Sequence, residues 1–105
     1  MPLIDQVKRK LDITWVDEDT NGRVADIMDS VAPVLRHKLG ITDPEFDFSK
    51  AGLENMLFLA LCLYEWNHSA NEFDVNYANE IAQCQAIHEV AYYKAQEGDS
   101  DAESS

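Results

Sequence analysis

The chain of 105 residues is strongly acidic, with 20 aspartates and glutamates against 8 lysines and arginines and a net charge of −12. This length fits one domain with a modest core, and a hydrophobic content of 46% excludes a wholly disordered chain. Binding nucleic acid through its phosphates needs a basic face, so the charge balance argues against sequence-specific DNA binding.

Two amphipathic helices are predicted in the first half of the chain. Apolar residues recur at helical spacing over residues 3–11, and the three cations at 8–10 suit the negative end of the helix dipole. A second apolar stripe runs over residues 21–39, with Gly40 placed to end that helix. Pro33 lies opposite the stripe, so we expect a bend on the solvent side in a helix that otherwise continues.

Two further helices are predicted in the second half, which makes the fold class all-α. Ser49 can cap the third helix, which reaches about Ser69, and its segment Met56–Tyr64 is apolar on every face. A helix of that kind must be covered on all sides, so we expect part of it to face another subunit. The fourth helix is predicted over about residues 74–95, again from the spacing of its apolar residues.

The acidic C-terminus predicts that the chain consists of a folded domain and a tail. Four acids and no base stand in the last nine residues, so we expect a compact bundle of about four helices at 1–96 and a disordered acidic tail at 97–105. Cys62 and Cys84 fall within apolar helical stretches, which is typical of buried thiols in a reducing compartment. The chain begins without the pattern of a signal peptide, and its longest apolar run is too short for a membrane span. We therefore expect a cytoplasmic protein.

The segment Asp17–Gly22 matches the first six positions of a calcium loop, D-x-[DN]-x-[DN]-G. Such a loop needs a bidentate glutamate at its twelfth position, where this chain has Met28 of the second stripe. The ninth position is Ala25, which cannot bind a cation. We therefore interpret the segment as an acidic turn with Asp19 or Thr20 as the N-cap of the second helix, and we predict no metal or other cofactor.

Two other residue pairs suggest chemistry but are incomplete. Glu65 and His68 have the spacing of di-iron bundles, which need two such pairs and two further glutamates, and this chain has one pair. His88 stands one helical turn after Cys84, yet no orienting third group can be recognised. We interpret His88 as a neutral, hydrogen-bonded core residue and Cys84 as a small hydrophobe. The sequence therefore predicts no enzyme.

Aromatic residues outside the predicted core stripes are candidate contacts with another protein. Aromatic side chains in loops and at helix ends often anchor protein interfaces. The alternative, equally open on the sequence, is that they close the ends of a small core. The five residues are Trp15, Phe46, Phe48, Phe73 and Tyr93.

The order of these features resembles a known family of small helical proteins. The matching segments are Ile13-Thr14-Trp15, the acids Asp17–Asp19, Asp47-Phe48-Ser49-Lys50-x-Gly52-Leu53, Tyr64-Glu65-Trp66-Asn67, Asn71-Glu72-Phe73 and Asn76–Ile81. They resemble the head–tail connector (adaptor, head-completion) proteins of tailed bacteriophages, and the resemblance covers about residues 3–93. One departure is Leu61–Leu63, where relatives often carry a basic residue.

The resemblance implies a structural virion protein. Such a subunit joins a ring of about twelve copies between the portal and the stopper or tail-completion protein, and the ring extends the DNA channel after packaging. Genomic DNA passes through it without specific binding, and the free protein can stay monomeric until a portal organises the ring. The expected location is the host cytoplasm during assembly and then the head–tail interface of the virion. The alternative is a small acidic cytoplasmic binding module that sequesters a basic or nucleic-acid-processing partner.

Overall fold

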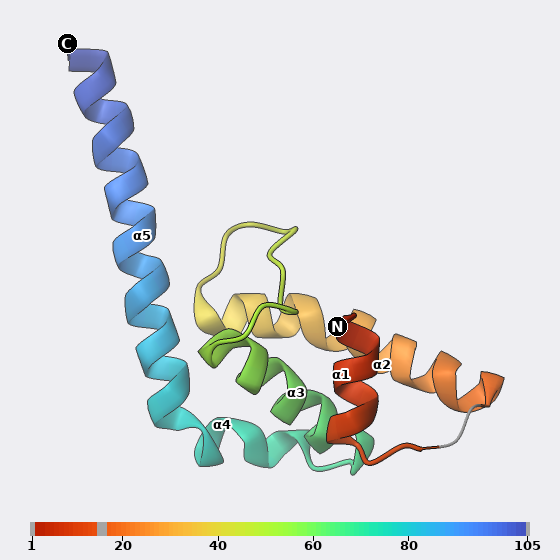
Figure 1. Cartoon of the computed structure of the whole chain (residues 1–105). Helices are drawn as coiled ribbons and strands as arrows, with labels where there is room; N and C mark the ends of the chain where they lie inside the picture. Colours follow the sequence, from red (N-terminus) through yellow and green to blue (C-terminus); the bar gives the residue numbers. More distant parts are fainter. Residues whose placement is uncertain (1, 15–16, 105) are drawn as a thin grey trace.

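The computed structural model describes the backbone of residues 2–14 and 17–104 and the side chains of residues 2–14, 17–91 and 94. Every regular element within these ranges is helical, which confirms the all-α class. Figure 1 shows the order of the elements along the chain, in which a single turn of 3₁₀ helix (η1) precedes the two last helices. The elements are α1 (Leu3–Lys10), α2 (Glu18–Leu39), α3 (Leu53–Trp66), η1 (Ala70–Glu72), α4 (Phe73–Asn76) and α5 (Ala78–Ser104).

Helix α2 begins earlier than the sequence suggests. Its N-cap is Asp17, whose Oδ1 accepts a hydrogen bond from the backbone N–H of Asp19 at 3.3 Å. The prediction of Asp19 or Thr20 as the cap is therefore wrong. The predicted end is confirmed, because Gly40 takes the left-handed conformation (φ 72°) at the C-terminus of the helix. The helix also continues through Pro33, whose side chain is exposed as predicted.

Helix α3 is shorter than predicted at both ends. Ser49 does not cap it, because the backbone N–H and hydroxyl of Ser49 both bond to Asp47 Oδ1 in the preceding turn. The chain then passes through Gly52, with φ 154°, and the helix starts at Leu53. Glycine suits this position because residues with a Cβ rarely adopt such a φ.

The fourth predicted helix is interrupted. Tyr77, with φ −117° and ψ 23°, separates the single turn of α4 from the long helix α5. Figure 1 shows that α5 changes direction after α4 and extends away from the rest of the chain. The bounds of α5 take in residues 97–104, whose side chains lie outside the described part of the structure, so the disordered tail stays a prediction.

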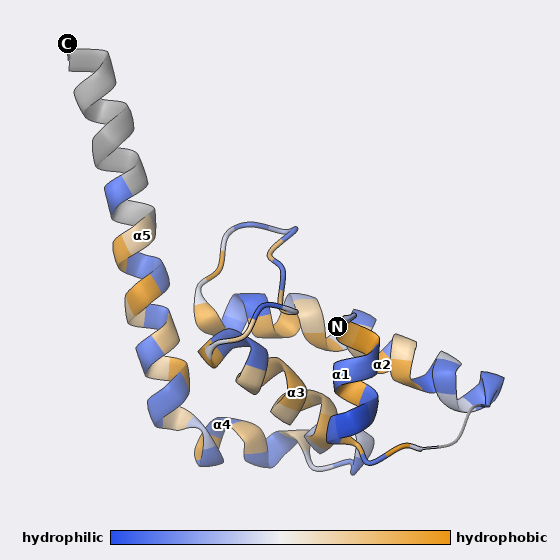
Figure 2. Ribbon diagram, in the orientation of Figure 1, coloured by the Kyte–Doolittle hydropathy of each residue, from blue (hydrophilic) through white to orange (hydrophobic). Residues whose placement is uncertain are grey.

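The core is built around α3, which packs against α1, α2 and α5. Figure 2 shows α3 as the most uniformly hydrophobic of the helices. In the segment Met56–Tyr64, all of which is described, Met56 alone is exposed. Its own chain therefore covers nearly all of this segment, and the expectation that part of it faces another subunit stays a prediction, with Met56 as the residue left exposed.

None of the described helices combines the length and hydrophobicity that crossing a membrane requires.

Candidate functional site

The segment that matches half a calcium loop forms a helix start. Asp17 Oδ2 accepts a hydrogen bond from the Thr20 hydroxyl at 3.1 Å, and residues 18–22 already belong to α2. Side chains on successive helical positions point in different directions, so these acids do not converge on one cation. In the described part of the chain, no three His, Cys, Asp or Glu side chains are grouped to hold a metal ion.

Glu65 and His68 do not share a helical face. Helix α3 ends at Trp66, and His68 takes a left-handed conformation (φ 58°) in the following turn. Its backbone N–H donates to the Glu65 carbonyl at 3.1 Å, while both side chains are exposed. The Glu65 carboxylate and the His68 imidazole therefore do not lie side by side on one helix, as a di-iron site would require.

His88 has a partner that the sequence did not reveal. Its Nε2 donates to Glu54 Oε1 at 3.1 Å, and the ring of Phe46 lies edge-on to the imidazole at a centroid distance of 5.6 Å. Glu54 lies in the first turn of α3, so this contact joins α5 to α3 and to the segment after α2. The two residues stand 34 positions apart, and no local pattern could have paired them.

The buried thiols are poor nucleophiles. Burial, with a smaller effect of the Glu65 charge, raises the pKa of Cys62 to about 12. Burial, followed by the charge of Glu54, raises the pKa of Cys84 to about 11. Because the thiolate is the reactive form, both side chains stay protonated and unreactive at neutral pH. The imidazole of His88, one turn after Cys84, is hydrogen-bonded to Glu54.

The five aromatic candidates do not form one surface. Phe48 and Phe73 are 3% and 0% exposed, so their assignment as partner contacts is wrong and they belong to the core. Phe48 stacks on Phe58 at 4.9 Å between ring centroids. Phe46 is half-buried and lies edge-on to Phe48 at 5.0 Å. Trp15 and the side chain of Tyr93 lie outside the described residues.

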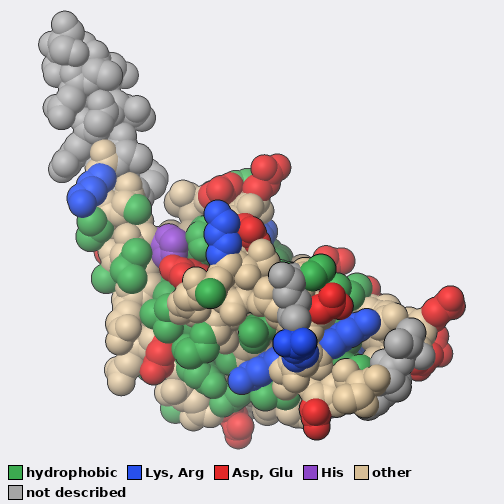
Figure 3. Space-filling model, in the orientation of Figure 1, with side chains coloured by type: hydrophobic (Ala, Val, Ile, Leu, Met, Phe, Trp, Pro, Cys, Tyr) green, Lys and Arg blue, Asp and Glu red, His purple; other side chains and the backbone are tan. Residues whose placement is uncertain are grey.

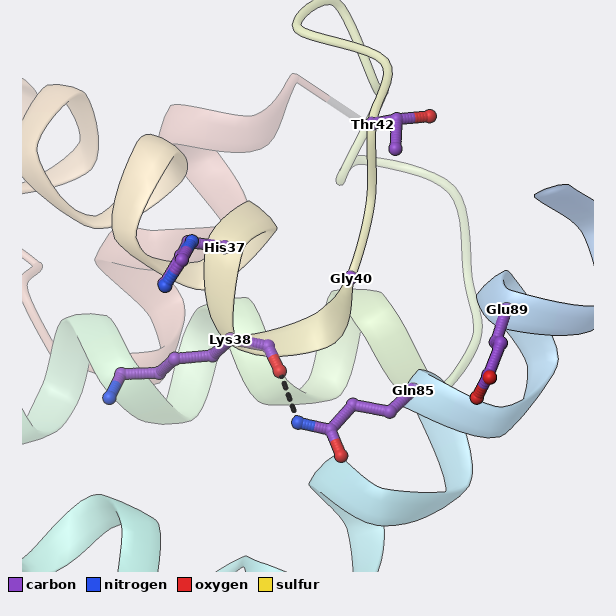
Figure 4. A pocket seen from close by; sticks show the side chains of 6 residues that line it. All are labelled: His37, Lys38, Gly40, Thr42, Gln85 and Glu89. Carbon is purple, nitrogen blue, oxygen red and sulfur yellow. Dashed lines mark hydrogen bonds between the residues drawn. The ribbon is translucent and has the colours of Figure 1, made fainter.

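A cavity of about 430 Å³ lies where the end of α2 meets α5. Figure 4 shows Gln85 and Glu89 of α5 facing the end of α2, with Gln85 bonded to the Lys38 carbonyl. Gln85 Nε2 donates this bond at 2.7 Å, while the Lys38 ammonium pairs with Asp74 of α4 at 2.8 Å. These polar groups attach the last two helices to α2, so we assign the cavity a structural role.

Exposed apolar side chains are the remaining candidate for function. On α5, Ile87 and Val90 are 56% and 52% exposed, and Figure 3 shows hydrophobic side chains along this helix beyond the compact body. Val34, Met56 and Val75 are exposed on three other helices, α2, α3 and α4. Single exposed apolar residues are normal on a protein surface. Two within one turn of a projecting helix form a stripe, and a stripe of this kind suits contact with another protein.

No family model, no curated protein and no solved structure matches this chain.

Proposed function

We propose that the chain is a structural virion assembly protein, an adaptor subunit that forms a ring between the portal and the stopper or tail. The observation that carries this proposal is the long helix α5, which leaves the body and exposes Ile87 and Val90. A subunit of a ring needs such a surface, because each copy must contact its neighbours and the proteins above and below. The motifs that resemble head–tail connectors, from Ile13 to Ile81, support the same function.

The charge of the chain also suits a DNA channel. With a net charge of −12, the surface repels the phosphate backbone. Asp43, Glu45 and Asp47 are exposed together in the segment between α2 and α3. A ring of such subunits would let DNA slide through without holding it, which an extension of the portal channel requires.

Electron microscopy with the portal protein of the same phage tests the proposal. We expect the full-length chain to add a ring of density to one end of the portal when the two proteins are mixed with the chain in excess. The chain alone is imaged as the control, since a monomer in isolation is compatible with assembly on a portal. Portal particles that remain unchanged with the chain in excess would refute the function, whether or not the chain associates with itself.

One observation favours a second candidate, an acidic module that binds a basic protein. A cavity of about 430 Å³ is lined by Asp43, Glu45, Asp47 and Glu54, with Lys50 as its one base. A basic side chain from a partner would find several carboxylates there. Affinity capture with the wild-type chain and with an Asp43→Asn, Glu45→Gln, Asp47→Asn variant discriminates the two. Loss of a captured nucleic-acid enzyme with the variant would favour the acidic module.

A further inference from the structure

A groove of about 350 Å³ runs between the start of α1, helix α2 and residues 45–48. Its walls are mainly apolar, with Met28 and Ala32 on one side and Phe46 and Phe48 on the other. Its lining also includes three acids, Asp29, Glu45 and Asp47, and one base, Arg36. No described residue of α5 lines this groove, so the chain's own last helix leaves it open.

A face of α5 has the complementary character. Gln83, Ile87, Val90 and Lys94 follow one another at intervals of four, three and four residues, which places them on one side of a helix. All four are exposed, whereas Ile81 and Cys84 of the same helix are buried in the body. We call these four residues the α5 stripe. It has two apolar residues at its centre and ends in Lys94, the one lysine or arginine of the helix.

We propose that the α5 stripe of one copy docks in the groove between α2 and residues 45–48 of a second copy. Ile87 and Val90 would then cover the apolar walls, and Lys94 would meet the acids Asp29, Glu45 and Asp47. Burial of the apolar side chains supplies most of the affinity, while the charges fix the direction in which α5 lies. This inference rests on the proposed function, because it names the contact between neighbouring subunits of the ring.

The positions of the two surfaces favour a second copy as the partner. Figure 1 places α5 on one side of the segment between α2 and α3, and the start of α1, which borders the groove, on the other side. One chain therefore presents the stripe and the groove in different directions and cannot join them by itself. A contact of this head-to-tail kind leaves a free stripe and a free groove at the ends of every assembly, and it closes into a ring when the rotation per subunit allows.

Disulfide trapping between two variants that each carry one introduced cysteine tests the contact. Full-length Val90→Cys and Ala32→Cys chains are mixed at high concentration under mild oxidation, alone and together with the portal protein, and the buried native thiols do not compete. We expect the mixed disulfide dimer to exceed that of a control mixture by about tenfold, because docking raises the effective concentration of the two thiols. The control pairs Ala32→Cys with Val75→Cys, which is 79% exposed on α4.

A second pair, Ile87→Cys with Met28→Cys, allows for a shift along the groove, since a disulfide needs Cα atoms within about 7 Å. Yields equal to the control for both pairs would overturn the inference. Charge reversal gives an independent measurement: Lys94→Glu should weaken self-association about fivefold, and Asp29→Lys together with Glu45→Lys should restore it. Weakening without any rescue would contradict the assigned direction of α5.

The inference and the proposed function fail in different ways. Rings that form on the portal without any trapped dimer would keep the adaptor function and overturn the α5 contact. Trapped dimers above the control, with portal particles that never gain density, would support the contact and refute the adaptor function. An Ile87→Asp variant, checked for normal helicity by circular dichroism, should lose both the trapped dimer and the ring if both proposals hold.

Discussion

Replacement of Phe73 by alanine tests whether this residue belongs to the core. Phe73 is fully buried, and its ring lies 5.9 Å from that of Tyr64 and 5.2 Å from that of Tyr77. Truncation of a buried phenylalanine costs about 3–5 kcal/mol, through lost burial and the cavity that remains. The free energy of unfolding of a domain is about 5–15 kcal/mol, so we expect Phe73→Ala to remove a large share of it.

Urea denaturation followed by circular dichroism measures this loss. Phe73→Leu should cost less, about 1–1.5 kcal/mol, and keeps the effect measurable if the alanine variant does not fold. Val75→Ala is the matched control, since Val75 lies two residues further along the chain and is 79% exposed. Its change should stay within about 0.5 kcal/mol. If Phe73→Ala left the urea midpoint unchanged, the assignment of Phe73 to the core would be refuted, and Phe73 would again be a candidate contact with another protein.

Further predictions concern Gly22, Gly40, the two cysteines and Asp17. Gly22→Ala should stabilise α2 by about 0.5–1 kcal/mol, because a Cβ there meets nothing within 4 Å. Gly40→Ala should destabilise by about 1 kcal/mol at its φ of 72°, and thermal melts of the two variants would contradict this account if both shifted in the same direction. The raised pKa values of Cys62 and Cys84, about 12 and about 11 against an ordinary 9.0, mean that the folded chain holds both protons more tightly than the unfolded one. Their contribution to stability is therefore complete below about pH 9 and is lost as the pH rises above it, so urea midpoints should fall more steeply in alkali for the wild type than for a variant with both cysteines replaced by alanine. Asp17→Ala should lower stability by about 1 kcal/mol by removing the N-cap, and a calcium-dependent rise in the wild-type Tm would contradict the helical assignment of residues 18–22.

The sequence predicts the all-α class and most of α1 and α2 because these helices depend on local signals. The apolar residues of α2 recur at helical spacing, and buried Val24, Val31 and Leu35 confirm the face that they define. Gly40 ends the helix because glycine readily takes the left-handed conformation (φ 72°), which residues with a Cβ disfavour. Such features require no knowledge of distant segments.

The sequence predicts the ends of α3 and the fourth helix wrongly, because distant residues or competing turns determine where these helices begin and end. Ser49 is a good N-cap by type, yet the carboxylate of Asp47 two residues earlier holds it in a turn. The break at Tyr77 follows from an aromatic cluster, because its ring packs against both Tyr64 of α3 and Phe73 of α4. A continuous helix over residues 74–95 fits the spacing of the apolar residues, but it is not compatible with the packing of Tyr77 against Tyr64 and Phe73.

The candidate site was less accessible to prediction than the fold. The aromatic candidates lie off the predicted stripes, yet Phe48 and Phe73 are buried through contacts that only the tertiary structure brings together. The pairing of Glu54 with His88 depends in the same way on the packing of α5 on α3. The exposed face of α5 could have been found from its helical spacing, had the break at Tyr77 been known.

Helix α5 is anchored in the core at one end and projects from the body at the other, so a small tilt at the anchored end produces a larger displacement further along. Ile81 and Cys84 are buried in the body, whereas Lys94 stands thirteen residues beyond Ile81, about 20 Å along the helix at 1.5 Å per residue. A tilt of about 10° at the anchored end would displace Lys94 by about 3–4 Å over this length. A change in packing around Cys84 that tilted α5 by this angle would therefore move the outer part of the helix by about 3–4 Å. Substitutions in this small part of the core would therefore change the position of the outer part of α5 without any substitution on the surface of that helix.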